Sequence, residues 1–444
     1  MSGRVLGRQL SSFQIIILGF LGLVLAGTAL LMIPAATADG SGASLSDAFF
    51  TATSAVCVTG LVIKDTALYW SYFGQAVILV LIEIGGLGII TAAVYIAVLS
   101  GKKINLLERT VLRDAISTHQ TGGGIRMTKF IVKIALIIEF LGAAVMLPVF
   151  CGRYGMEGIW MSVFHSVSAF CNAGFDIMGK RSGAFSSLTS FAGNPVISFT
   201  ICMLIIAGGL GFMTWDDVVE HKLHFRKYKM QSKVILAMTA ALIIVPGTLF
   251  YLTEFREGNT MTRVCLSVFQ AVTPRTAGFN TADLNAMSGV ARCILIALML
   301  IGGAPGSTAG GMKTTTVAVI GANSFSVFRR DKNVQVFGRR VEDSTVKEAV
   351  AILTLYILFA AAGAMAVSAA EHLPVSVCLY ETSSAIGTVG LSLGITPTLG
   401  LFSRLVLAGL MFFGRVGGLT LVLAAVSAKR INASHCPSEK IAVG

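Results

Sequence analysis

The sequence has 444 residues, of which 55% are hydrophobic and only 13% are charged, and its formal net charge is +12. Soluble domains usually carry about 25% charged residues, so this composition excludes an ordinary soluble domain and indicates a membrane protein. The basic residues lie in short segments between apolar runs, which favours membrane topology over nucleic-acid binding as the reason for the positive charge.

Eight apolar runs are long enough to cross a bilayer, which takes about 20 residues per helix. They lie at residues 13–34, 73–99, 130–151, 195–214, 234–252, 290–320, 349–370 and 401–428. A short amphipathic run lies between the two members of each successive pair, at 47–53, 161–167, 265–272 and 377–383. Helices of under three turns cannot span, so we expect these runs to re-enter the membrane. The predicted fold class is an all-α integral membrane protein with eight transmembrane helices.

Four related loop segments follow the amphipathic runs, at residues 54–61, 168–175, 273–279 and 384–391. Each contains a glycine followed by Leu or Phe, and these glycines recur at near-equal steps of about 110 residues, which indicates a repeated supersecondary unit. The unit is a spanning helix, a short pore helix, a loop and a second spanning helix. We predict four repeats, at 13–99, 130–218, 233–320 and 346–428, around one pseudo-fourfold pore, with a cytoplasmic tail at 429–444.

The fourth loop contains Thr388-Val389-Gly390, the core of the signature that builds potassium-selective filters. In such filters, backbone carbonyls replace the hydration shell of the ion. One triplet of this kind is weak evidence, and its repetition in four loops makes the signal strong. The predicted filter, with K⁺ as its only metal ion, consists of Val58, Thr59, Gly60, Asn172, Ala173, Gly174, Thr276, Ala277, Gly278, Thr388, Val389 and Gly390. Three of the four triplets differ from Thr-Val-Gly, which leaves the degree of K⁺ over Na⁺ discrimination open.

The second spanning run of each repeat also carries clustered glycines. Small residues let helices approach closely, and this accounts for Gly85-Gly86-Leu87-Gly88 in repeat one and Gly208-Gly209-Leu210-Gly211 in repeat two. In repeat three, a proline among many glycines should interrupt the helix. We predict an intramembrane gate loop there, formed by Gly302, Gly303, Ala304, Pro305, Gly306, Ser307, Thr308, Ala309, Gly310 and Gly311. Arg415 lies at a similar depth on the last span. It is predicted either to hold the loop or repel cations there, or only to cap broken backbone.

Four further charged residues are candidates for function. Glu83 and Glu139 fall within apolar spans, where acids are functional candidates, although a buried hydrogen bond between repeats would also explain them. Arg275 beside the third filter segment and Glu381 in the fourth pore helix are candidates to support the filter loops. The eight cysteines have no paired spacing, and no Ser/His/Asp or Cys/His arrangement lies in a soluble domain, so we expect neither an enzyme nor a covalently bound cofactor.

The basic segments predict the orientation of the chain. The loops at 101–129, 216–233 and 329–347 are rich in Lys and Arg, which marks them as cytoplasmic. Both termini are then cytoplasmic, the filter loops face outward, and the chain is a multi-pass protein of the plasma membrane.

Together these motifs resemble the superfamily of potassium transporters that includes TrkH, KtrB and the plant HKT proteins, over essentially the whole chain. The resemblance rests on the four filter segments, on the glycine-rich break in repeat three and on Gly414-Arg415-Val416-Gly417-Gly418. It is strongest to the KtrB branch. That branch implies a homodimer with one pore per protomer in the lipid bilayer, bound to a cytoplasmic KtrA-like ring of nucleotide-binding regulatory subunits. ATP or ADP would act only through that ring, and Na⁺ would act as an activator.

The function that we expect is potassium uptake by a channel-like transporter, selective through the filter loops and gated by the intramembrane loop. Two other functions are open. A coupled K⁺/H⁺ or K⁺/Na⁺ symporter would use Glu83 or Glu139 as an intramembrane carboxylate, but carriers of that kind usually show two related halves. A membrane scaffold would not need four filter-like loops.

Overall fold

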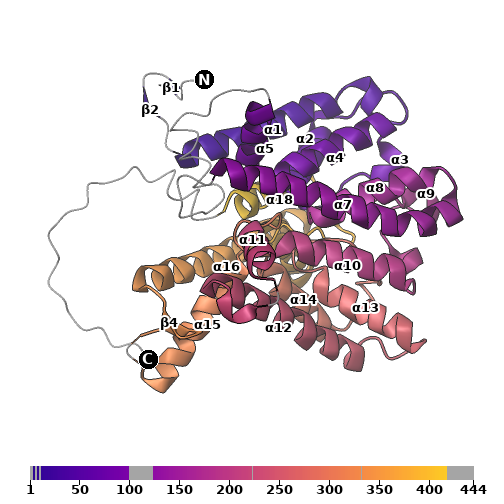
Figure 1. The fold of residues 1–444 in the computed structure, drawn as a ribbon. Helices are drawn as coiled ribbons and strands as arrows, with labels where there is room; N and C mark the ends of the chain where they lie inside the picture. The colour runs from indigo at the N-terminus through magenta and orange to yellow at the C-terminus, as the bar shows by residue number, and fades with distance from the viewer. Residues whose placement is uncertain are drawn as a thin grey trace.

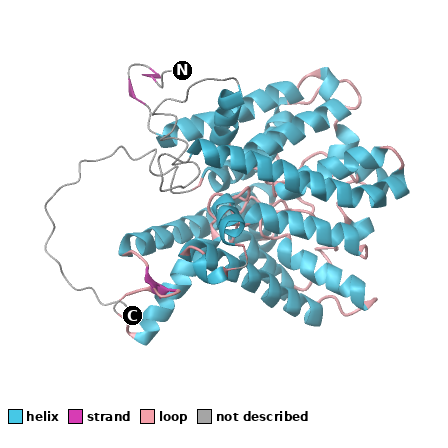
Figure 2. Ribbon diagram, in the orientation of Figure 1, coloured by secondary structure: helices cyan, strands magenta, loops and turns pink. Residues whose placement is uncertain are grey.

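The computed structural model describes residues 4–5, 8–9, 12–99, 124–222, 224–331 and 333–417. Nearly all of this chain is helical (Figures 1 and 2). The exceptions are loops and two small antiparallel hairpins, β1 (Arg4–Val5) with β2 (Arg8–Gln9) and β3 (Gln335–Val336) with β4 (Arg339–Arg340). The predicted tail at 429–444 and most of the basic loop at 101–129 lie outside the described residues.

The helices fall into four successive groups of similar composition. The first contains α1 (Ser12–Leu31), η1 (Pro34–Ala36), α2 (Leu45–Val56), α3 (Thr66–Tyr69), α4 (Tyr72–Leu87) and α5 (Ile89–Leu99). The second contains α7 (Gly124–Tyr154), α8 (Glu157–Phe170), α9 (Gly179–Ser182), η2 (Thr189–Phe191), α10 (Pro195–Gly209), α11 (Phe212–His221) and η3 (Phe225–Lys227). The third contains α12 (Met230–Thr253), α13 (Thr260–Val272), α14 (Gly289–Leu300) and α15 (Thr314–Arg329). The fourth contains α16 (Asp343–Glu371), α17 (Val375–Ile386), η4 (Thr396–Thr398) and α18 (Leu401–Val416).

Four helices of the described chain are long and apolar enough to cross a membrane: α1, α7, α12 and α16. The pair α10 and α11 adds a fifth candidate span, bent by 97° at its break. The molecule is therefore an all-helical, multi-pass membrane protein. Each long helix opens one of the four groups, which is where the sequence places the first span of each repeat.

The predicted second spans of the first, second and fourth groups are not the continuous helices that the sequence predicts. The run at 73–99 is interrupted at Gly88, the run at 195–214 breaks before Gly211, and α18 ends before Gly417; all three glycines have positive φ, between 85° and 93°. The interruption at 301–313, expected from Pro305, is also present. The expectation that the glycines of repeats one and two serve close packing alone is wrong, because backbone of positive φ suits glycine and ends a helix.

The four short helices predicted to be pore helices, α2, α8, α13 and α17, have 12 to 14 residues, so they are longer than the under three turns predicted for them. Ser44 caps α2 by accepting from the N–H of Asp47. Towards their C-terminal ends these helices become fully buried. The fourth group contacts the first through a salt bridge, in which Arg404 Nη1 on α18 lies 3.1 Å from Asp47 Oδ1 on α2.

Glycines on the second helices let them lie directly on the ends of the pore helices. A Cβ on Gly85 would overlap the carbonyl of Val56, the last residue of α2. In the same way, a Cβ on Gly208 would overlap the carbonyl of Phe170, and one on Gly414 would overlap that of Ile386. These glycine clusters therefore have two roles: one glycine allows close packing, and another, with positive φ, ends the helix.

We expect Gly208→Ala to destabilise the protein. The new Cβ would displace the Phe170 carbonyl at the end of the pore helix, and overpacking of this kind costs about 1–3 kcal/mol. The matched control is Gly209→Ala, whose Cβ would have only an ordinary contact of 3.5 Å with Asn172 Nδ2. Thermal unfolding and the yield of monodisperse protein in detergent measure the effect. Equal stability of the two variants would contradict this packing.

Candidate functional site

The four loop segments that follow the pore helices share one backbone conformation. In each segment the glycine has positive φ, and so does the residue two positions before it. These residues are Val58 (49°) and Gly60 (86°), Asn172 (57°) and Gly174 (68°), Thr276 (69°) and Gly278 (78°), and Thr388 (52°) and Gly390 (97°). Positive φ is strained for Val and Thr, which are β-branched. Its recurrence at the same place in four segments indicates a required backbone path.

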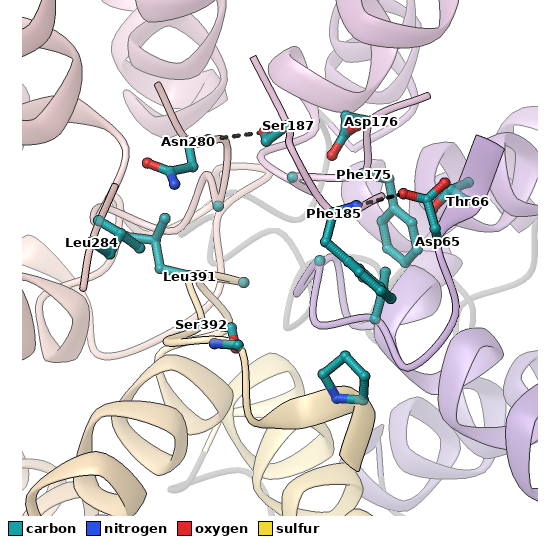
Figure 3. Close-up of a pocket in the computed structure, with 17 residues that line it drawn as sticks. Asp65, Thr66, Phe175, Asp176, Phe185, Ser187, Asn280, Leu284, Leu391 and Ser392 are labelled. Atoms are coloured by element: carbon teal, nitrogen blue, oxygen red, sulfur yellow. Dashed lines mark hydrogen bonds between the residues drawn. The ribbon is translucent and has the colours of Figure 1, made fainter. Parts of the chain in front are cut away.

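The four segments close into a ring, which we call the glycine ring. A Cβ on Gly60 would overlap the carbonyl oxygen of Ala173, and one on Gly174 would overlap that of Ala277. A Cβ on Gly278 would meet the carbonyl of Val389, and one on Gly390 would meet that of Thr59. Each segment therefore contacts the next, and the fourth contacts the first. The four glycines line a single cavity of about 170 Å³, the ring cavity (Figure 3).

A hydroxyl residue near the end of each pore helix holds the segment that follows it. The backbone carbonyls of Ser54, Ser168, Thr273 and Ser384 accept from the N–H groups of Thr59, Ala173, Ala277 and Val389 at 2.8–3.0 Å. The side chains add a second bond. Ser54 and Ser384 accept from the N–H of Gly60 and Gly390 at 3.1 and 3.0 Å, whereas Ser168 and Thr273 donate to the carbonyls of Phe175 and Phe279. The sequence analysis missed this role, although the recurring hydroxyl at the start of each segment was a visible signal.

Glu381 and Arg275 support different elements. Glu381 is buried in α17, where its Oε1 accepts from Ser392 Oγ at 2.7 Å and from the Leu393 N–H at 2.9 Å. Its Oε2 accepts from Thr396 Oγ1, so it anchors the loop that follows the fourth segment. Arg275 is also buried and donates to Thr239 of α12 at 3.4 Å. Their predicted role in supporting the filter loops stays a prediction.

The segment between α14 and α15 folds back on itself. The N–H of Gly302 donates to the carbonyl of Met312 at 2.7 Å, and Lys313 Nζ donates to the carbonyl of Ala309 at 2.8 Å. A Cβ on Gly310 would overlap the side chain of Thr388, so this loop lies directly against the fourth segment of the glycine ring. The predicted gate residues 302–311 are all non-helical.

The same loop is tied to the break in the second group. The N–H of Ala304 donates to the carbonyl of Gly209 at 2.8 Å, and the N–H of Phe212 donates to that of Gly306 at 2.8 Å. The Thr308 hydroxyl donates to the carbonyl of Phe170, at the end of pore helix α8. These contacts place the loop across the ends of α8 and α10, which belong to the second group.

Arg415 connects the loop to the first group. Its side chain is half-buried, and its guanidinium donates to the carbonyls of Thr308, Gly85 and Gly86. Gly85 and Gly86 lie in the last turn of α4, where carbonyls lack helical partners. The contact with Thr308 fits the predicted role in holding the loop, and the contacts with Gly85 and Gly86 fit the alternative of capping broken backbone.

The loop also lines a second cavity of about 280 Å³, the loop cavity. Its lining includes Pro305, Ser307, Lys313 and Arg415, together with glycines at the helix breaks. None of the four ring glycines lines it. The loop therefore contacts the fourth segment of the glycine ring and also lines a cavity that the ring glycines do not reach.

Glu83 and Glu139 come together with Cys171, which the sequence analysis did not connect to them. The three ligand atoms lie within 4.8 Å of one another, and Cys171 Sγ is 3.3 Å from Glu83 Oε2. These residues belong to α4, α7 and the end of α8, so they fit the alternative of buried hydrogen bonding between repeats. The only other such group among the described residues is Asp217, Glu220 and His221, where Asp217 already bonds Ser232 and Lys229.

The chain is similar to known transport proteins over nearly its whole length. A family model described as TrkH, cation transport protein, matches residues 8–433. The potassium/sodium uptake protein NtpJ of Enterococcus hirae is 38% identical, with 98% of each chain covered. The Ktr system potassium uptake protein B of Bacillus subtilis is 34% identical, covering 96% of this chain and 95% of the relative. The crystal structure of the potassium transporter TrkH from Vibrio parahaemolyticus has the same fold, with a TM-score of 0.76 at 20% identity over 95% of this chain and 86% of that one.

We expect Arg415→Ala to loosen the loop. Each hydrogen bond to a charged group contributes about 1.5–3 kcal/mol, and 1.4 kcal/mol is a tenfold change in an opening equilibrium. Amide hydrogen exchange in residues 302–313 should therefore accelerate roughly tenfold or more, as measured by mass spectrometry. The control is Arg404→Ala on the same helix, because Arg404 bonds Asp47, Leu399 and Pro397 instead. If exchange in the loop is the same in both variants, Arg415 does not hold it.

Proposed function

Because the chain belongs to the TrkH family of cation transport proteins, we propose that it takes up potassium across the plasma membrane through a channel-like pore. The observation that carries the proposal is the glycine ring. Four equivalent backbone segments meet around one cavity with no room for a Cβ between them. In selectivity filters, backbone oxygens replace the hydration shell of K⁺. In the glycine ring, the close approach between neighbouring segments is likewise made by backbone.

Two further features support a cation as the substrate. Each of the four pore helices ends just before a ring segment, and the C-terminal end of a helix carries partial negative charge that favours a cation. The hydroxyls of Ser54 and Ser384 fix the two ring glycines whose N–H groups they bind. A dehydrated ion needs ligands at fixed distances, and such bonds limit how far the ring can relax around a smaller ion.

In this proposal the four groups are four repeats, and the pore runs from the ring cavity through the glycine ring to the loop. The loop at 302–313 is the barrier, held by Arg415. Flux requires the loop to move away from the ring, which breaks the bond between Arg415 and the carbonyl of Thr308. Ions then move down their electrochemical gradient, and an inside-negative potential contributes about 2.3 kcal/mol per charge per 100 mV.

The ring cavity faces outward and both termini are cytoplasmic, because the basic loops mark the cytoplasmic side. Two relatives are named as protein B of a Ktr system, which supports association of this chain with further subunits. We propose a homodimer on a cytoplasmic ring of nucleotide-binding subunits, as the family resemblance implies. The cytoplasmic ring of regulatory subunits would move the loop at 302–313, with Na⁺ as an activator of transport. The relative named as a potassium/sodium uptake protein makes Na⁺ a second candidate substrate.

The second candidate function is coupled symport through Glu83 or Glu139. Neither residue lines the ring cavity or the loop cavity. Both lie behind the second ring segment, in the cluster with Cys171. This placement favours a packing role and supports the channel-like mechanism.

Rubidium uptake into proteoliposomes tests the function. With an inside-negative potential as the only driving force, we expect uptake without a sodium or proton gradient, and we expect it to persist in Glu83→Gln and Glu139→Gln. Uptake that needs a proton or sodium gradient, and that disappears in either variant, would establish the symporter and refute the channel-like mechanism.

Substitutions at two adjacent serines, Ser383 and Ser384, test whether a pore-helix hydroxyl positions the glycine ring for selectivity. Ser384→Ala removes the acceptor of the Gly390 N–H, and an unsatisfied buried donor costs about 1–3 kcal/mol. We expect the ratio of rubidium to sodium flux to fall several-fold, and Ser384→Thr to preserve it because the hydroxyl remains. Ser383→Ala is the control, since Ser383 is equally buried and its Oγ has no partner among the described residues. The same ratio in Ser384→Ala and Ser383→Ala would exclude the hydroxyl as a positioning group for selectivity.

A further inference from the structure

A second set of equivalent residues lies beyond the glycine ring. The residue two positions after each ring glycine lines the ring cavity, and the four are Val62, Asp176, Asn280 and Ser392. Figure 3 shows Asp176, Asn280 and Ser392 around this cavity, on three different repeats. The order of contacts in the glycine ring puts Asp176 between Val62 and Asn280, with Ser392 on the opposite side. This set presents one carboxylate, one amide, one hydroxyl and one apolar group.

The cavity has only negative formal charge. Asp65 and Asp176 are the charged residues in its lining, which contains no Lys, Arg or His. A cleft lined by one sign of charge concentrates ions of the opposite sign. A volume of about 170 Å³ also leaves room for a cation with several of its waters.

The two carboxylates are not equivalent. Both oxygens of Asp65 are bound to backbone: Oδ1 accepts from the N–H groups of Ala67 and Leu68 at 2.9 and 3.0 Å, and Oδ2 accepts from that of Phe185 at 2.8 Å. Asp65 thus anchors the loop that carries Phe185, as Figure 3 shows. It is a structural group rather than a free ligand.

Asp176 accepts fewer backbone hydrogen bonds than Asp65. Its Oδ1 accepts one backbone bond, from the N–H of Met178 at 3.0 Å. Its other neighbour is the Ser187 hydroxyl, which itself accepts from the N–H of Asn280 at 3.0 Å. An ionised carboxylate has about four lone-pair sites, so Asp176 keeps capacity for a cation.

We propose that Val62, Asp176, Asn280 and Ser392 form an outer binding site for a partly hydrated monovalent cation, with Asp176 as its charged ligand. The Asp176 carboxylate supplies hard oxygen ligands, which suit a hard cation. The site rests on the proposed function, because it supplies ions to the glycine ring. It differs from the ring in using side chains and in being asymmetric, so it raises the local concentration of cations rather than selecting among them.

Concentration-dependent rubidium uptake by the full-length chain in proteoliposomes tests the site. We expect Asp176→Asn to raise the half-saturating rubidium concentration several-fold, and by a larger factor than it lowers the maximal flux. The increase should shrink at high ionic strength, because salt screens the carboxylate. The control is Asp39→Asn, which removes an exposed carboxylate that bonds Ser41 and does not line the cavity; we expect it to leave uptake unchanged.

Charge relocation makes the test specific. Asn280 Oδ1 accepts from Gln270 Nε2 and from the Ala282 N–H, and Asp at this position keeps an acceptor oxygen for both donors. Asp176→Asn with Asn280→Asp should therefore restore the half-saturating concentration towards the wild-type value. Asn280→Asp alone should lower it, which keeps the proposal testable if Asp176→Asn does not fold.

An unchanged half-saturating concentration in Asp176→Asn, an equal change in Asp39→Asn, or no effect of Asn280→Asp would overturn the outer site. Those outcomes leave the transport function intact, because the wild-type protein still carries rubidium. Failure of the wild-type protein itself to carry rubidium would refute the proposed function instead.

Discussion

The contact among four backbone segments at Gly60, Gly174, Gly278 and Gly390 is the constraint on which the rest of the structure depends. Each segment approaches the next so closely that a Cβ would overlap a carbonyl oxygen. Because backbone contacts backbone here, no side chain can adjust to relieve the contact. The position of each segment must therefore be fixed by the helices packed against it. The pore helices do this through the hydroxyls at Ser54, Ser168, Thr273 and Ser384, and glycines on three of the second helices let those helices lie against the pore-helix ends.

The helix breaks follow from the same glycine clusters. One glycine of a cluster permits close approach, and a later one adopts positive φ and ends the helix. A helix that ends inside the protein leaves carbonyls without helical partners. Arg415 has five N–H donors in a rigid fork and binds such carbonyls on the first group together with one on the loop. A single side chain thereby couples three of the four groups beneath the ring.

A single chain that contributes all four quarters of a site can vary each of them. The residue before the positive-φ pair is Cys57, Cys171, Arg275 or Gly387, and the residue two positions after the glycine is Val62, Asp176, Asn280 or Ser392. The backbone is nearly fourfold, whereas the chemistry on either side of it is not. The loop at 302–313 and the Asp176 carboxylate each belong to one group, and an assembly of four identical chains could not have just one of each.

The sequence by itself determined the helical class, the position of the four loop segments and the interruption near Pro305, and its resemblance to the TrkH superfamily is confirmed. These features are local: apolar runs mark helices, and Pro among glycines cannot continue one. The breaks at Gly88 and Gly211, the longer pore helices, the cluster of Glu83, Glu139 and Cys171, and the partners of Arg415 were decided only by the tertiary structure. From the sequence alone, a glycine can continue a helix or end it. The outcome depends on whether a distant group donates hydrogen bonds to the carbonyls that lose their helical partners at the break. Here Arg415 does so for Gly85 and Gly86 across more than 300 residues of chain, a pairing that no local pattern records.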